Sequence, residues 1–258
     1  MTSAAALKRP FSEMPSDPSR IQLAYELDAS LGNHDHEDTL EKWQVVAHLG
    51  EGFGLDNLPP CDQCAARWNR LEEEGGFVDE DEECLHRLHV GVLDLVKIRW
   101  GGSQNPYWAM EEESQNLAEI AEAIFNEEHT GFTEEFEELA DWGGSDVLVL
   151  DKAEVVEAWR GFGLGPMIAA DAFRRLAPGC CAVMVHPAPI DSTGMSQDEW
   201  ARGRDRLREM WATLGFVPYG DTPYMIFATS WADPETKQYA LRKATRELSA
   251  NWRSAQQG

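Results

Sequence analysis

The feature that most constrains the fold is a strand that runs into a glycine-rich turn and then into a helix. Residues 146–150 form an apolar, β-branched run that is typical of a buried strand. Residues 166–176 carry apolar side chains at helical spacing. Between them, Gly161, Gly163 and Gly165 permit a sharp turn and leave the backbone amides uncovered. The pattern therefore predicts an anion site at the N-terminus of a helix.

The spacing of these glycines differs from two common phosphate loops. The dinucleotide fingerprint requires G-x-G-x-x-G, whereas the chain has G-x-G-x-G directly after Arg160. The P-loop requires Gly-Lys followed by Ser or Thr, and the chain has no such triplet. Two interpretations stay open, a different phosphate loop and a glycine turn that binds nothing.

The segment after the predicted helix continues as an alternation of strands and helices. Residues 180–185 are a short buried strand, and residues 197–214 have the apolar stripe of a helix. Residues 216–219 and 224–227 then form two strands around a turn that contains glycine, aspartate and proline.

Two short motifs carry a resemblance to a known family. Arg160-x-x-Gly163-x-Gly165 resembles the acetyl-CoA pyrophosphate loop of the GNAT superfamily of N-acetyltransferases. The segment 211–216, Trp-Ala-Thr-Leu-Gly-Phe, is similar to the "YxxLGF" segment of that family. The elements between about residues 145 and 230 follow the family's order. The resemblance implies an α/β (α+β) fold with a mixed, splayed central sheet and helices on both faces.

The same resemblance implies an enzyme. It would be an acetyl-CoA-dependent N-acyltransferase, in which an amine attacks the thioester directly in a ternary complex. The cofactor, acetyl-CoA as co-substrate, would lie on the strand end and the glycine turn. The residues that this implies are Val155, Val156, Arg160, Gly161, Phe162, Gly163, Leu164 and Gly165.

Such a reaction needs a base that removes a proton from the amine. The candidates are Glu154, near the open edge of its strand, and His186, at the C-terminal end of the next strand. Asp151 is a third candidate. Each also fits a structural role, as a salt-bridged strand carboxylate or as a capped histidine.

The chain departs from the family at two positions on the helix at 197–214. Trp211 stands where many members have a tyrosine, and an indole cannot supply a proton to the departing thiolate. Arg204 takes the place of the usual asparagine. Tyr219, Tyr224 or water would have to act instead. The alternative is a catalytically inactive GNAT-fold module that binds CoA or another protein.

A group of cysteines and histidines suggests a second kind of site. Cys61 and Cys64 form a C-x-x-C pair, and Cys84, His86 and His89 follow. Thiolates and imidazoles in such a group can hold a structural zinc ion, which would stabilise an interaction module. The group also fits three ordinary reduced cysteines in an acidic loop.

The rest of the chain supplies further predicted elements. Strands are predicted at 21–31, 40–49 and 90–100, and a helix is predicted at 115–128.

The chain then divides into a mobile lead (1–20), a GNAT-like domain (21–230) with an acidic, cysteine-containing insertion at about 57–88, and a C-terminal helix (231–258). That helix packs on the domain or on a second subunit, which would make a homodimer.

The formal net charge of −24 narrows the class of partner. A surface this acidic repels phosphate backbones, so we expect no nucleic-acid partner. It attracts a cationic amine, either a small molecule or a protein lysine, although excess acid also simply improves solubility. We expect no membrane partner and no signal peptide, and the odd number of five cysteines favours a cytoplasmic location.

Overall fold

The described residues form one seven-stranded sheet with the strand order β1-β2-β3-β4-β5-β7-β6. This computed structural model describes residues 9–27, 29, 36, 38–50, 88–140, 144–190, 193–229 and 234–257, with side chains from 240 onward in the last range. All neighbouring strands are antiparallel except β4 and β5, which are parallel. The strands are Ile21–Leu27 (β1), Leu40–Leu49 (β2), His89–Ile98 (β3), Asp146–Val155 (β4), Cys180–Val185 (β5), Val217–Pro218 (β6) and Met225–Ala228 (β7).

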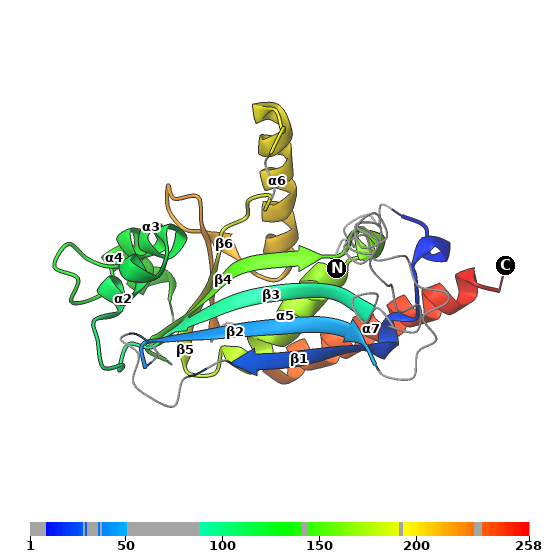
Figure 1. Cartoon of the computed structure of the whole chain (residues 1–258), viewed down its shortest axis with the longest axis horizontal. Helices are drawn as coiled ribbons and strands as arrows, with labels where there is room; N and C mark the ends of the chain where they lie inside the picture. The colour runs from blue at the N-terminus through cyan, green and yellow to red at the C-terminus, as the bar shows by residue number, and fades with distance from the viewer. Residues whose placement is uncertain are drawn as a thin grey trace, which may run out of the picture.

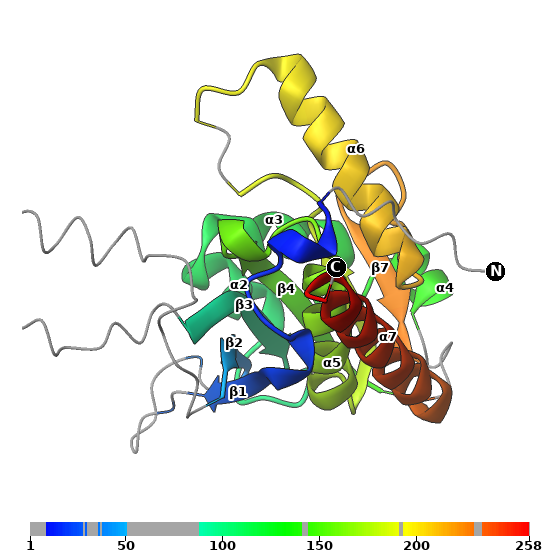
Figure 2. The same cartoon turned by 90° about the vertical axis from the view of Figure 1, so that its right-hand side faces the viewer.

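Helices lie on both faces of this mixed sheet, as predicted. Figures 1 and 2 show α5 and α7 side by side under one face, α2, α3 and α4 grouped at one end of the molecule, and α6 projecting away from the body. The helices are Pro106–Glu113 (α2), Gln115–Ile124 (α3), Glu134–Leu139 (α4), Leu164–Leu176 (α5), Gln197–Thr213 (α6) and Pro234–Ala255 (α7).

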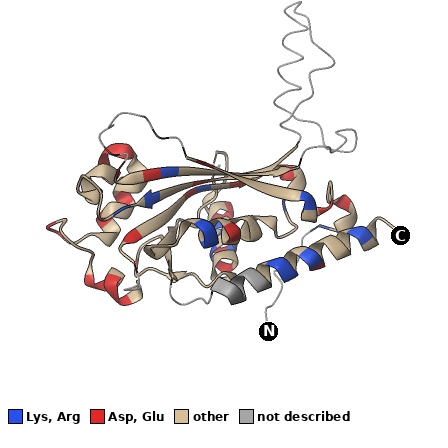
Figure 3. Ribbon diagram, turned by 90° about the horizontal axis from the view of Figure 1, so that it is seen from below, with Lys and Arg blue, Asp and Glu red and all other residues tan. Residues whose placement is uncertain are grey.

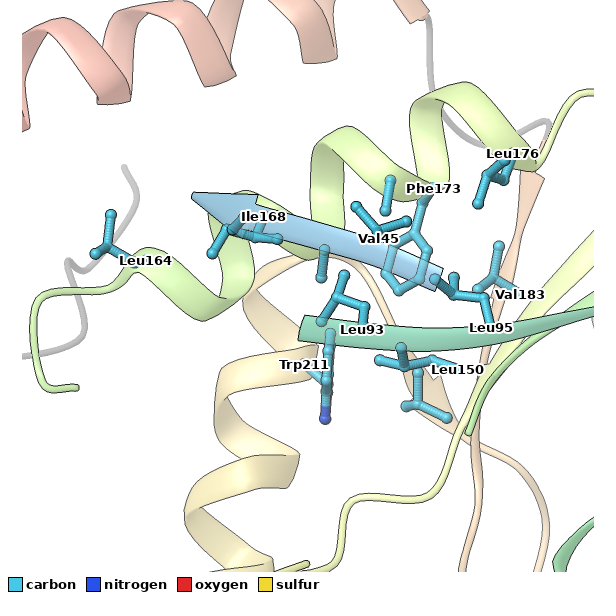
Figure 4. Packing of buried hydrophobic residues seen from close by; sticks show 14 of the residues in the cluster. Val45, Leu93, Leu95, Leu150, Leu164, Ile168, Phe173, Leu176, Val183 and Trp211 are labelled. Atoms are coloured by element: carbon cyan, nitrogen blue, oxygen red, sulfur yellow. The ribbon is translucent and has the colours of Figure 1, made fainter. Parts of the chain in front are cut away.

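The alternation of side chains along β4 divides the interior into two cores. Leu148 and Leu150 pack into the core under α5, whereas Val147 and Val149 pack into the core next to α2–α4. Successive strand residues point to opposite faces, so one buried strand supplies both cores. Figure 4 shows Phe173 of α5 lying over the strand side chains of the first core.

β4 extends beyond its parallel partner. Its pairing with β5 ends at Leu150 and Val185, while its pairing with β3 continues to Val155. An irregularity in the register with β3 falls at this point, between Asp94 and Leu95. In the described part of the chain, residues 151–155 therefore have a strand neighbour on one side only. At about 3.3 Å per residue this open edge is roughly 13 Å long.

The predicted elements agree with the structure at most positions, but the helix predicted at 115–128 is too long. The helix α3 ends at Ile124, and Phe125 adopts an extended conformation and bridges to Phe132. Phe125 is buried there. Its apolar side chain therefore fits the spacing of the helix although the residue lies outside it. The helices α2 and α4 were not predicted.

Residues 9–20, which fall within the predicted mobile lead, lie against α7. Asp17 accepts hydrogen bonds from Ser249 at 2.6 Å and from Arg253 at 2.9 Å, and the Trp252 indole donates to the Met14 carbonyl at 3.0 Å. Burial would raise the pKa of Asp17, but the hydrogen bonds from Ser249 and Arg253 and two from Ser19 outweigh it and lower the pKa to about 2. The N-terminal segment is thus attached to the C-terminal helix.

Several predictions fall on residues that lie outside the described part. Residues 1–8 of the lead and residues 51–87, which hold almost all of the predicted insertion, are among them. The division of the chain into three parts stays a prediction. Among the described helices, none combines the length and the apolar character that crossing a bilayer requires.

Charge is unevenly distributed over the described residues. Figure 3 shows acidic residues gathered at the end that carries α2, α3 and α4, while basic residues lie along α7. Arg242, Lys243 and Arg246 are exposed on α7. The chain as a whole is acidic, so the basic character of α7 gives the molecule two electrically different ends.

Candidate functional site

The glycine turn has the backbone that the sequence predicts. Gly161 and Gly163 have φ values of 87° and 78°, in the left-handed region that favours glycine. Gly163 caps α5 without a side-chain hydrogen bond, and a Cβ placed there would meet no atom within 4 Å. The space beside Gly163, at the start of α5, is therefore open, whereas Arg9 packs against Gly161.

The other residues predicted to bind a cofactor have structural contacts. Phe162 and Leu164 are buried in the core under α5. The Arg160 side chain donates from Nε to the Val155 carbonyl at 2.6 Å, which ties the turn to the end of β4. A Cβ on Gly165 would lie 3.5 Å from the Val155 side chain, so helix and strand are close here. Val156 is partly exposed.

The segment similar to "YxxLGF" forms the end of α6. Trp211 is buried, and its ring packs at 6.2 Å from Phe173 and at 5.6 Å from Phe216. The Phe216 amide donates to the Trp211 carbonyl at 3.3 Å, so the chain turns back after the helix. This segment joins α6 to the core, which gives Leu-Gly-Phe a packing role.

Two of the three predicted base candidates have partners of their own. Glu154 forms an ion pair with Lys152 at 3.2 Å on the same face of β4. Asp151 accepts a hydrogen bond from the Asn116 amide of α3 at 2.5 Å. Neither contact involves His186.

His186, the third candidate, lies at a meeting point of four segments. It follows β5 directly, and its ring centroid lies 5.3 Å from that of Tyr224, which precedes β7. Burial lowers the pKa of His186, the positive charge of Arg208 on α6 lowers it further, and Glu119 on α3 opposes the shift. The imidazole is therefore neutral at neutral pH and can accept a proton.

An acidic pocket of about 300 Å³ is lined in part by Tyr224, the residue whose ring packs against His186. Glu119 and Glu122 are three residues apart on α3 and point to the same side of the helix. Tyr224 is buried on the opposite wall, and the turn before β7 lines one side of this shallow, open pocket. The lining residues are Glu119, Glu122, Ala123, Thr222, Pro223 and Tyr224.

The two carboxylates affect the phenol that they face. Burial, together with the charges of Glu119 and Glu122, raises the pKa of Tyr224 to about 12. The phenol stays protonated at neutral pH, so its hydroxyl can donate or accept a hydrogen bond. Tyr219 differs, because its hydroxyl donates to the Ala123 carbonyl at 2.8 Å and also contacts the Thr133 hydroxyl at 2.9 Å. Tyr219 therefore has a structural role.

The predicted zinc ligands are not brought together in the described part of the chain. Cys61, Cys64, Cys84 and His86 lie outside it. His89 begins β3 and is exposed. No group of three or more His, Cys, Asp or Glu side chains among the described residues is arranged to hold a metal ion.

The sequence analysis proposed His186 and Tyr224 as candidates but did not include Glu119, Glu122 or Arg208. The spacing of the two glutamates on a predicted helix could have marked them as one acidic surface. Their position opposite His186 depends on how α3 packs across the end of the sheet. No pattern in the sequence contains that information.

Comparisons with known proteins give limited information. No family model matches the chain. A curated relative, succinyl-diaminopimelate desuccinylase 2 of Shewanella loihica, is 31% identical over 104 residues, which cover 39% of this chain. The match spans only 26% of that protein, about a quarter of its length.

The comparison corrects the family assignment made from the sequence. The matched relative is by name a desuccinylase, which is a hydrolase and not a transferase. The predictions of GNAT membership, of an acetyl-CoA-dependent N-acetyltransferase and of acetyl-CoA as co-substrate are therefore wrong. The inactive GNAT-fold module depended on the same assignment, whereas the zinc prediction rests on Cys61, Cys64, Cys84 and His86, which lie outside the described residues, and on His89. The motifs that carried it are a left-handed glycine turn and a helix end, and both have structural causes in this fold.

Proposed function

We propose that this chain binds a small cationic amine in the acidic pocket between α3 and the turn before β7. The observation that carries the proposal is a pocket lined by Glu119 and Glu122, with the imidazole of His186 packed against Tyr224 of its wall. Carboxylates bind an ammonium group through charge-assisted hydrogen bonds. The Tyr224 ring adds an aromatic wall that suits the methylene groups of such a ligand.

The separation of β4 from β5 would form the floor of the site. Pairing between the two strands ends at Leu150 and Val185, and His186 is the next residue. The C-terminal ends of β-strands are where ligands bind in many α/β proteins. The open edge of β4 at residues 151–155 leads from this point to the glycine turn. A ligand longer than a simple amine would follow this edge.

Binding of 1,5-diaminopentane, measured by isothermal titration calorimetry, tests the proposal. Replacing both Glu119 and Glu122 by glutamine removes two negative charges at the pocket. Each exposed pair contributes roughly 1 kcal/mol, so we expect the dissociation constant to rise by about 30-fold.

A matched control removes the same charge elsewhere. Glu127 and Glu128 are exposed in the turn after α3 and do not line the pocket. Their replacement by glutamine is expected to change the dissociation constant by less than about twofold. Equal weakening by the two double variants would mean that only overall charge attracts the amine, and the proposed pocket would be rejected.

The affinity is also expected to depend on pH through His186. Because the pKa of His186 is lowered, the imidazole becomes charged only below the pH at which an ordinary histidine does, and it then repels a bound cation. We expect the association constant for 1,5-diaminopentane to fall by about fivefold, or roughly 1 kcal/mol, between pH 7 and pH 5. In His186→Gln, the fall of the association constant that is due to protonation of His186 is expected to disappear. An unchanged pH profile in that variant would exclude His186 from the site.

A second candidate function is hydrolysis of an N-acylated amine, which the desuccinylase relative favours. Water would attack the acyl carbon, the C–N bond would break, and the amine nitrogen would take up a proton. His186 would accept the proton from water, and the acidic pocket would hold the amine part of the substrate.

Release of lysine from Nε-succinyl-lysine, followed with an amine-reactive fluorophore, tests this activity. We expect release by the parent chain and a loss of about 100-fold or more in His186→Gln. If the chain binds amines but releases no lysine, the hydrolytic function is rejected and the binding function remains.

A further inference from the structure

We propose that Arg208 binds a carboxylate of the ligand, so that the preferred ligand is a zwitterionic amino acid and not a simple polyamine. This inference rests on the proposed amine pocket and names the class of molecule that it recognises. The carboxylate would lie on the α6 side of His186, and the ammonium group would lie on the α3 side.

Arg208 has one donor atom without a partner in the described part of the chain. Its Nε is buried and has no hydrogen-bond partner among the described residues. None of the ion pairs in the described part of the chain includes its guanidinium. By contrast, Arg204 one turn earlier bonds to Asp205 at 3.1 Å and lies over the Trp200 ring. A buried donor without an acceptor is unfavourable, and a bound anion would relieve that cost.

The composition makes the lack of a partner for Arg208 among the described residues more informative. The chain has 46 acidic residues and only 22 lysines and arginines, so acidic partners are abundant. Among the described residues Arg208 nevertheless forms no ion pair with a carboxylate, and its charge acts on His186. The guanidinium offers several donors in one plane, which match both oxygens of a carboxylate.

Packing holds Arg208 in this position. Three residues later, Trp211 is buried in the core, so the C-terminal part of α6 is fixed to the domain. Nearer its start, α6 lies so close to the segment after β5 that a Cβ on Gly203 would be 2.9 Å from Pro189. α6 is therefore placed against the segment that carries His186, and Arg208 lies between these two contacts along the helix.

Charges of opposite sign thus flank His186. Glu119 acts on the imidazole from α3, and Arg208 acts on it from α6. Tyr224 packs its ring edge-on against the same imidazole. A ligand with an ammonium group and a carboxylate matches both signs at once, whereas a diamine leaves the guanidinium unpaired and is repelled by it.

Two ligands that differ by a single carboxylate test the inference. L-Lysine and 1,5-diaminopentane have the same carbon chain and the same two amines. We expect the parent chain to bind L-lysine about tenfold or more tightly than the diamine in isothermal titration calorimetry. In Arg208→Met the preference is expected to reverse, since the carboxylate then meets only Glu119 and Glu122.

Arg206→Met is the matched control. Arg206 is exposed on the same helix, so its replacement removes the same charge without touching the site. We expect it to keep the preference for L-lysine. The ratio of the affinities for L-lysine and 1,5-diaminopentane depends on the carboxylate contact. A loss of fold would instead lower the affinity for both ligands together.

The outcomes separate this inference from the proposed function. Equal affinities of the parent chain for both ligands, or an unchanged ratio in Arg208→Met, would overturn the carboxylate contact and leave the amine pocket standing. Failure of the parent chain to bind either ligand would reject both proposals.

Discussion

Replacing Trp159 by alanine is expected to lower the free energy of unfolding by about 3–5 kcal/mol. Trp159 ends the short 3-10 turn Glu157–Trp159 between β4 and the glycine turn, and it is among the largest fully buried side chains described. Its removal leaves a cavity in the core that holds α5 against the sheet. Urea unfolding followed by circular dichroism measures the loss.

Two further substitutions make this prediction specific. The Trp159 indole nitrogen is buried without a hydrogen-bond partner among the described residues, so Trp159→Phe loses volume but no hydrogen bond and is expected to cost less than the alanine variant. Trp108 is 48% exposed on α2, and Trp108→Ala is expected to change stability by no more than about 0.5 kcal/mol. Similar losses in Trp159→Ala and Trp108→Ala would contradict the burial of Trp159.

Replacing Gly91 by alanine is expected to destabilise the protein by about 3 kcal/mol, near the upper end of the range for overpacking. A Cβ at this position would lie 2.6 Å from the Glu154 carbonyl oxygen and 3.3 Å from the Val155 Cα. Both atoms belong to the backbone of β4, so the two strands would have to separate. Thermal unfolding and urea unfolding both report the change.

Gly101 provides the control for this prediction. It follows β3 in the chain, and a Cβ there would meet no atom within 4 Å. Gly101→Ala is expected to leave stability unchanged or slightly increased, because it reduces the freedom of the unfolded chain. If Gly91→Ala were equally neutral, the close approach of β3 to the end of β4 would be incorrect.

Much of the sheet could be predicted from the sequence because its strands have strong local patterns. Residues 40–49 and 180–185 become β2 and β5 with the predicted bounds. Errors arise where tertiary contacts decide the conformation. Phe125 continues an apolar helical pattern but is extended, because it packs against Trp100 and Phe132 and bridges to the latter.

The candidate site was less predictable than the fold. The sharp turn at the glycines was predicted correctly. Phe162 beside it was predicted to bind a cofactor, but it is a core residue. His186 was found from its place after a buried strand. Glu119 and Arg208 face it only because α3 and α6 approach from opposite sides, and neither helix has a sequence pattern that specifies this approach. Short motifs also proved insufficient to identify the family.

The uneven distribution of charge has a consequence for the kinetics of association. The proposed pocket opens at the acidic end of the molecule, among the carboxylates of α2, α3 and α4, whereas the basic residues of α7 lie elsewhere (Figure 3). A cation that diffuses toward the protein is guided to the end that contains the pocket. Added salt shortens the range of this attraction to about 8 Å at physiological ionic strength. The association rate of an amine should therefore fall as salt is raised, while its dissociation rate changes much less.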